Sequence, residues 1–146
     1  MRIATLRDPA SGDERSFMLV LEAGDDPMVE LTNFARQHDV GAGRFTAIGA
    51  FSSATLAFYD RATQHYDEIP VDEQVEVITF MGNLSRFQGE PRVHAHAALS
   101  RPDGSLVAGH FLNAKVWPAL EVSVVVSPAT LERELDPDSG LPLLRV

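Results

Sequence analysis

The chain has 146 residues, no cysteine and a formal net charge of −9 at pH 7. This length suits a domain with a substantial core, and the lack of cysteine excludes disulfides, thiolate nucleophiles and cysteine-bound metal clusters. The acidic charge opposes nucleic-acid binding unless basic residues gather on one face, and the arginines and Lys115 are dispersed, with no two adjacent in sequence.

The N-terminal residues contain no apolar stretch like that of a secretion signal. No window approaches the ~18 apolar residues that a membrane-spanning helix needs. We therefore expect a cytoplasmic protein without a membrane partner.

A strand and a helix are the first elements that the sequence predicts. Ser16–Leu21 is rich in apolar residues and is typical of a strand. Asp25 or Asp26 can then cap a helix whose first residue is Pro27, which is favoured at that position. Apolar residues follow at helical spacing, and Gly41 lies just beyond the expected end of the helix.

From there to Val126 the chain alternates candidate strands with short turn-like stretches, which favours antiparallel neighbours. Pro128–Leu135 is predicted to be a short helix capped by Ser127, and a turn at 136–140 and an extended tail follow it. The pattern predicts a single α+β domain over residues 1–146, a mainly antiparallel β-sheet with one longer and one short helix. The candidate strands after the first helix are Arg44–Phe51, Ala54–Tyr59, Gln64–Ile69, Gln74–Leu84, Val93–Leu99, Leu106–Ala114 and Glu121–Val126.

The segment Val122–Val126 is apolar on both of its faces. Such a strand needs cover on both sides, either from a layer of helices or from another subunit. Because one or two helices cover little of a sheet of this size, the sequence predicts homo-oligomerisation.

A predicted hairpin carries three of the five histidines of the chain. His94 and His96 alternate along one strand, so their side chains share a face. The Pro-Asp-Gly sequence at 102–104 fits a three-residue hairpin loop with a type I turn and a left-handed glycine. Counting back from this loop along both strands places His96 opposite His110, so three imidazoles converge.

Three converging imidazoles are a candidate metal site. Neutral imidazole is a common ligand for zinc and other first-row metals, and three histidines leave a fourth position for water or substrate. The alternative is a set of partly buried histidines that are hydrogen-bonded to carboxylates or to the backbone. His38 and His65 are predicted to be ordinary surface residues. Acidic side chains that could orient a metal-bound histidine are Asp60, Asp72, Glu73, Glu76 and Glu121.

Three weaker motifs favour ordinary structure over chemistry. The glycines of Gly41–Gly49 lead from a helix into a strand, the reverse of a phosphate-binding loop. Ser52 and Ser53 lack the G-x-S-x-G surroundings of a nucleophile. The acidic residues of 136–140 are interrupted by Pro137 and lack the glutamate of a calcium loop.

An ordered series of motifs spans nearly the whole chain. The motifs are Gly49–Leu56, Phe58–Asp60, Ile69–Val77, Val93–His96, Asp103–His110 and Leu120–Val122. This series resembles the PPC ("plants and prokaryotes conserved") domain. The resemblance implies an α+β fold around a mainly antiparallel sheet, and a homotrimer in prokaryotic members. His94, His96 and His110 resemble the metal-binding residues of some bacterial and archaeal members, while Ala108 stands where the family often has a glycine.

PPC proteins are often called DNA-binding. In the nuclear plant proteins, however, AT-rich DNA is bound by a separate AT-hook with an R-G-R-P core, which this chain lacks. Three hypotheses follow. The first is a trimer with a three-histidine metal site, zinc first of all, that binds or converts a small molecule. The second is a DNA-associated regulator, and the third is a scaffold whose assembly is itself the function.

Overall fold

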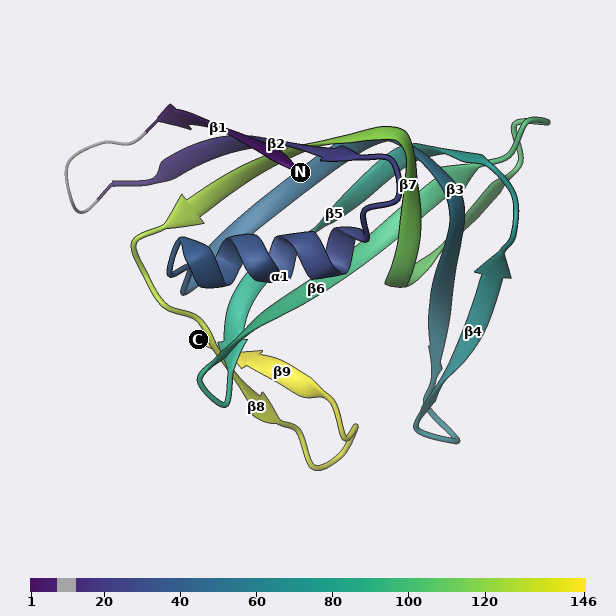
Figure 1. Cartoon of the computed structure of the whole chain (residues 1–146). Coiled ribbons are helices and arrows are strands. Elements are labelled where there is room, and N and C mark those ends of the chain that lie inside the picture. The colour runs from purple at the N-terminus through teal and green to yellow at the C-terminus, as the bar shows by residue number, and fades with distance from the viewer. Residues whose placement is uncertain (8–12) are drawn as a thin grey trace.

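The computed structural model describes residues 1–7 and 13–146, and this part of the chain is mainly β-sheet with one helix (Figure 1). The helix α1 spans Pro27–Gln37. Eight of the nine strand contacts are antiparallel, and β5 with β8 is the parallel pair. The strands are β1 Arg2–Arg7, β2 Arg15–Glu22, β3 Ala42–Asp60, β4 His65–Val71, β5 Val75–Phe87, β6 Glu90–Ser100, β7 Leu106–Ser127, β8 Glu132–Leu135 and β9 Pro142–Arg145.

Four strands form a closed ring of pairings. β3 pairs with β5, β5 with β6, β6 with the first residues of β7, and β7 with β3. β1 and β2 extend the sheet beyond β7, β4 pairs with the far half of β3, and the hairpin of β8 and β9 continues from the end of β5. The long strands β3 and β7 must therefore bend, and their register shifts lie where they do so.

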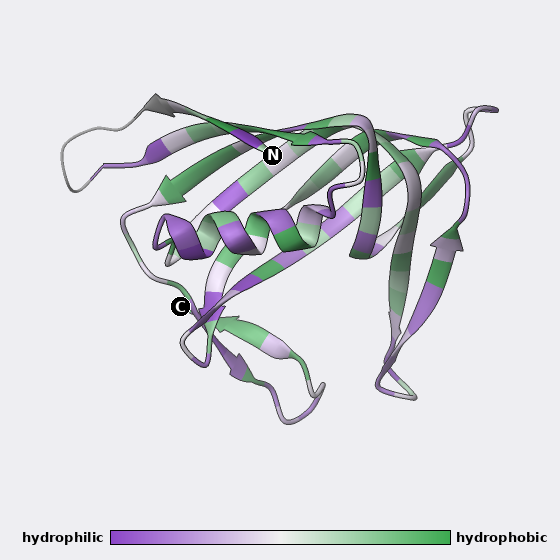
Figure 2. Ribbon diagram, in the orientation of Figure 1, coloured by the Kyte–Doolittle hydropathy of each residue, from purple (hydrophilic) through white to green (hydrophobic). Residues whose placement is uncertain are grey.

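The helix forms as its sequence predicts. The side chain of Asp26 accepts hydrogen bonds from the backbone amides of Met28 and Val29, at 2.8 and 3.4 Å, and Pro27 occupies the first turn. Asp25 instead accepts an ion pair from the N-terminal amine at 3.1 Å. The helix packs on β6 and β7, and its ribbon carries both polar and apolar residues, as expected for an element with one face on the core (Figure 2).

The core lies on the inner face of the curved sheet. Phe45, Phe51, Phe80 and Phe111 contact one another there with ring centroids 4.5–6.4 Å apart. In β7 the inward residues are Val122, Val124 and Val126, while Ser123 and Val125 between them are half-exposed on the outer face. The sheet is therefore covered on one side by its own core and left open on the other.

Two pairs of expected strands are single strands. The stretches predicted at 44–51 and 54–59 belong to β3, and those at 106–114 and 121–126 belong to β7. Irregular residues between them shift the register by bulges, for example between Gly49 and Phe51, without ending the strand. Polar residues and prolines within β3 and β7 therefore mark bends in a continuous strand and do not form turns between two strands.

The short helix expected over Pro128–Leu135 is wrong. The chain bends after Ser127, and Glu132–Leu135 forms β8. The backbone amide of Arg86 at the end of β5 donates to the carbonyl of Leu131 at 2.8 Å. The open edge of β5 therefore pairs with a segment whose sequence pattern is locally helical. Pairing with β9 then completes a hairpin.

In the described part of the chain, none of the helical structure has the length and apolar character that a membrane crossing requires.

Candidate metal centre

The hairpin of β6 and β7 sets the register of the histidines as predicted. The backbone amides of Arg101 and Gly104 donate to the carbonyls of Ser105 and Arg101, both at 2.9 Å, and Gly104 has a left-handed backbone with φ 82°. The side chain of Asp103 caps the loop by accepting from the amide of Ser105 at 2.9 Å. From this closed loop the pairing runs back to His96 opposite His110.

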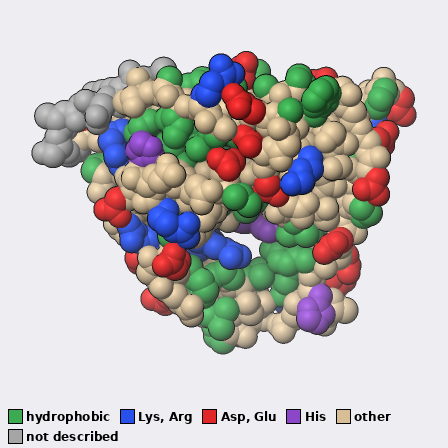
Figure 3. Space-filling view, in the orientation of Figure 1, with side chains coloured by type: hydrophobic (Ala, Val, Ile, Leu, Met, Phe, Trp, Pro, Cys, Tyr) green, Lys and Arg blue, Asp and Glu red, His purple; other side chains and the backbone are tan. Residues whose placement is uncertain are grey.

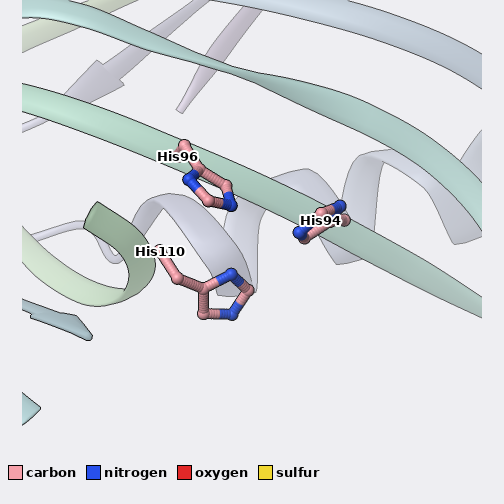
Figure 4. Close-up of side chains that lie close together, drawn as sticks. All are labelled: His94, His96 and His110. Carbon is pink, nitrogen blue, oxygen red and sulfur yellow. The ribbon is translucent and has the colours of Figure 1, made fainter. Parts of the chain in front are cut away.

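The three imidazoles form a triangle (Figure 4). Each pair of ring centroids among His94, His96 and His110 is 5.3 Å apart. One nitrogen of each ring lies within 4.8 Å of the others. Around a tetrahedral zinc ion the nitrogens would be about 3.3 Å apart, so modest rotations of the rings would bring them to a common ion.

Burial favours the neutral form of His94 and His110. Desolvation, followed by the nearby His94 and His96, lowers the pKa of His110 to about 4. Desolvation and then the charge of Arg133 lower the pKa of His94. Metal binding requires the neutral imidazole, so these two rings are in the competent form at neutral pH.

One buried nitrogen of the cluster lacks a hydrogen-bond partner among the described residues. The Nδ1 atom of His110 is buried and has no hydrogen-bond partner among the described residues. Buried polar atoms without a partner are rare and costly. The three residues offer imidazole nitrogens and have no acidic partner among the described residues, a donor set that fits a first-row divalent metal ion such as zinc.

Neighbouring strands form an aromatic wall beside the cluster. The ring of Tyr66 on β4 stacks on His110 with centroids 4.6 Å apart and an interplanar angle of 26°. Tyr59, which pairs with Tyr66 across β3 and β4, contacts it edge-on at 5.1 Å. Burial and then the neighbouring Tyr59 raise the pKa of Tyr66.

Two glycines allow the strands to approach closely at the cluster. A β-carbon at Gly82 would lie 2.1 Å from the carbonyl oxygen of His94, and one at Gly109 would lie 2.7 Å from that of Ala57. Both contacts are impossible without displacement of backbone. These glycines therefore help to set where β6 and β7 carry their histidines.

Two arginines beside the cluster were not identified from the sequence. Arg92 precedes His94 by two residues on the same strand, so the two share a face, and strand alternation could have revealed it. Arg133 lies on β8, is 8% exposed and donates through Nη2 to Asn83 at 2.7 Å. Asn83 is the partner of His94 in the register of β5 and β6. Arg133 could not have been found, because its segment was expected to be a helix.

The other candidates lie outside the cluster. In the described ranges 1–7 and 13–146, none of the five acidic residues proposed to orient a histidine has a hydrogen bond or ion pair with His94, His96 or His110. Glu73 instead pairs with Arg101 at 2.8 Å, and Asp60 caps the turn after β3. His65 is exposed as expected.

His38 differs from its expectation as a surface residue. It ends α1 and is half-buried. Its ring packs on Phe34 and Phe17 at 4.6 and 5.0 Å. It therefore serves the core and lies apart from the three clustered histidines.

Comparisons with known proteins agree with this architecture. The Plants and Prokaryotes Conserved (PCC) domain matches residues 9–128. The bifunctional protein GlmU of Synechococcus sp. (strain JA-3-3Ab) is 29% identical over 133 residues, which are 89% of this chain and 20% of that protein. The chain thus spans about a fifth of the length of this curated relative.

Solved structures superpose over most of the chain. A metal-containing protein from Archaeoglobus fulgidus has a TM-score of 0.83 and 32% identity, covering 90% of this chain and 93% of that one. A candidate DNA-binding protein from Ralstonia eutropha JMP134 has a TM-score of 0.85 and 27% identity, covering 97% and 95%. With the family match, the shared fold and the H-x-H and G-H motifs in place, the chain belongs to the Plants and Prokaryotes Conserved domain family, abbreviated PCC or PPC.

Proposed function

We propose that this protein is a homotrimeric PPC-domain protein in which His94, His96 and His110 bind a divalent metal ion, zinc first of all, for a small-molecule-binding or enzymatic role. The observation that carries the proposal is the triangle of three imidazoles, whose nitrogens lie within 4.8 Å of one another. The metal content named for the relative from Archaeoglobus fulgidus supports it.

Three histidine ligands leave one coordination position free. Catalytic zinc sites commonly have this composition, with water or substrate in the fourth position. When bound, the metal would supply Lewis-acid chemistry or an activated water. The protein supplies three imidazole rings, a register fixed by a tight loop, and an aromatic wall that shields one side of the site.

Metal analysis of untagged protein tests the proposal. We expect about one metal ion per chain in the wild type and a loss of most of it in H94A and in H96A. The matched control is H65A, because His65 is an exposed histidine on β4 outside the cluster. Wild-type protein that retains no stoichiometric metal after purification and zinc reconstitution would refute the metal site.

The open outer face of the sheet supports the proposed trimer. Ile48, Ile78 and Met81 are 61%, 55% and 50% exposed there. They lie beside Thr46, Ser123 and Val125 in adjoining shallow depressions. We call the four apolar residues Ile48, Ile78, Met81 and Val125 the outer apolar face; side chains of this kind favour burial against another subunit.

DNA association is the second candidate, favoured by the name of the relative from Ralstonia eutropha. It predicts duplex binding that weakens steeply with salt, since phosphate contacts release counterions. The net charge of −9 opposes it. An electrophoretic shift assay at low salt separates the two candidates: retarded duplex supports the regulator, and unretarded duplex removes it.

A further inference from the structure

We propose that the histidine site binds a small carboxylate ligand, whose carboxylate group is held by Arg92 and Arg133 while another oxygen of the ligand reaches the metal position. This inference rests on the proposed function and names the chemical class of its ligand. It is carried by two guanidinium groups that lie beside the cluster and have no acidic partner in the part of the chain that the structure describes.

Arg133 is a nearly buried cation with neutral partners. Its Nε donates to Ser85 Oγ at 2.8 Å, its Nη1 to the carbonyl of Pro142 at 2.8 Å and its Nη2 to Asn83 Oδ1 at 2.7 Å. Within the ranges that the structure describes, no carboxylate pairs with it. A buried charge is ordinarily compensated by an opposite charge, and here that charge is missing.

Arg92 supplies a second guanidinium on the same face. Ser85 stands opposite Arg92 in the register of β5 and β6, and Asn83 stands opposite His94. Because Arg133 bonds to both Ser85 and Asn83, its guanidinium lies next to the row that Arg92 and His94 form. Arg92 is exposed, and its side chain has no hydrogen bond or ion pair in the part of the chain that the structure describes.

The strand register and the hydrogen bonds of Arg133 together place both guanidiniums beside His94. Figure 3 shows basic side chains at the rim of a hollow in which a histidine is visible.

The charge balance of the site calls for an anion. The chain as a whole carries a net charge of −9, yet this site brings two guanidiniums, which have no acidic partner among the described residues, next to three histidines. A divalent ion would add to the positive charge. An anionic ligand would neutralise it, and attraction within a sheltered site is stronger than in bulk water.

Geometry favours a carboxylate of few atoms. The planar guanidinium fork matches the two oxygens of a carboxylate, and the donors of Arg92 have no hydrogen-bond partner within residues 1–7 and 13–146. Alternate residues of a strand are about 6.6 Å apart, so a ligand that bridges Arg92 and the metal position at His94 needs only a short carbon chain. The aromatic wall of Tyr66 and Tyr59 offers an apolar surface for that chain.

A purely structural role explains only part of this arrangement. Arg133 ties the hairpin of β8 and β9 to β5 through its three hydrogen bonds. That role does not need a second guanidinium, and it gives Arg92 no function. The test therefore addresses Arg92, whose exposed side chain can be replaced without disturbing the hairpin.

The experiment measures glycolate binding by calorimetry to the zinc-reconstituted protein. Glycolate carries one carboxylate and one adjacent hydroxyl oxygen. We expect saturable binding to the wild type, at least about tenfold weaker binding to R92Q, and unchanged metal content in that variant. The matched control is R2Q, because Arg2 is an exposed arginine of β1 that pairs with Glu22, and it should bind as the wild type does.

Two further ligands and one spectroscopic readout define the alternatives. Ethylene glycol, the neutral analogue, should not bind, and glycolate should change the visible absorption of the Co²⁺-loaded wild type. Tighter Arg92-dependent binding of inorganic phosphate would overturn the choice of carboxylate. Equal glycolate affinity in R92Q and the wild type would overturn the carboxylate inference but not the metal site, and so would a lack of glycolate binding to metal-loaded protein. Absence of metal from the wild type would instead refute the proposed function on which this inference rests.

Discussion

His110 is the cluster histidine whose pKa is lowered to about 4 by its surroundings. Its ring is stacked between the cluster and Tyr66, its Nδ1 is buried without a partner among the described residues, and its pKa is lowered to about 4. An unfolded histidine titrates near 6.5. Between these two values the unfolded chain therefore binds a proton that folded His110 does not accept.

This difference predicts a loss of stability in acid for the metal-free protein. The contribution of His110 is fully present above pH 6.5 and is lost as the pH falls to about 4, because protons then favour the unfolded chain. Allowing for partial solvent screening, we expect the wild type to lose about 1–3 kcal/mol more than H110Q across this range. Urea unfolding at pH 7 and pH 4.5 measures it, with H65Q as control; equal losses in H110Q and the wild type would contradict it.

At the scale of elements, the approach of β5 to β6 decides where His94 lies. Gly82 on β5 leaves no room for a β-carbon, which would stand 2.1 Å from the carbonyl oxygen of His94 and 2.8 Å from the ring of Phe45. The first of these atoms belongs to backbone. Substitution must therefore separate the two strands.

We expect G82A to lower the free energy of unfolding by about 1–3 kcal/mol and to weaken metal binding as well. The comparison variant is G43A, at a glycine of β3 whose added β-carbon would meet its nearest atom at 3.1 Å, a contact that small shifts can relieve. Urea unfolding and a zinc competition titration check both effects. If G82A bound zinc as tightly as G43A, the positioning role of Gly82 would be refuted.

The hairpin of β8 and β9 is held to the rest of the fold at both of its ends. Arg133 anchors it to β5, while the hydroxyl of Tyr59 and the side-chain amide of Gln64 donate to the carbonyls of Ser139 and Asp138 in its turn. The hairpin thereby connects the end of β5 with the hairpin of β3 and β4. Figure 1 shows the hairpin of β8 and β9 next to the end of β5.

Removing the Tyr59 hydroxyl should loosen this hairpin locally. In Y59F we expect faster amide hydrogen exchange at 132–145, with about 1 kcal/mol less protection. The amides of β5 and β6 pair within the ring of strands and should keep their rates. Hydrogen-exchange mass spectrometry measures both regions, and unchanged exchange at 132–145 would show that the other contacts suffice.

At the scale of the whole molecule, the outer apolar face is the surface that a single chain leaves open. A charge placed there should oppose assembly, because association would bury it without a partner. We expect I78E to sediment as a monomer, whereas V29E should keep the state of the wild type. Val29 is a fair control because it is 54% exposed on α1, close to the 55% of Ile78. A wild type that is itself monomeric in sedimentation equilibrium would refute the trimer.

Sequence alone determined the parts of this protein that depend on near neighbours. Asp26 and Pro27 start the helix through local hydrogen bonding and backbone geometry. The loop at 102–104 fixes the register through its own turn chemistry, so the residues of the hairpin suffice to place His96 opposite His110. The convergence of His94, His96 and His110 was therefore predictable, because strand alternation and one tight loop bring them together.

Only the tertiary structure decided the parts that depend on distant segments. The segment at 128–135 has a local helical pattern, yet it became β8 because the end of β5 offered it backbone hydrogen bonds. The same pairing carried Arg133 to the cluster from 39 residues beyond His94 along the chain. The bends of β3 and β7 likewise arise from closing the ring of strands. Local propensity contributes less free energy than pairing a strand edge and burying an apolar core. None of these three features could therefore be derived from neighbouring residues.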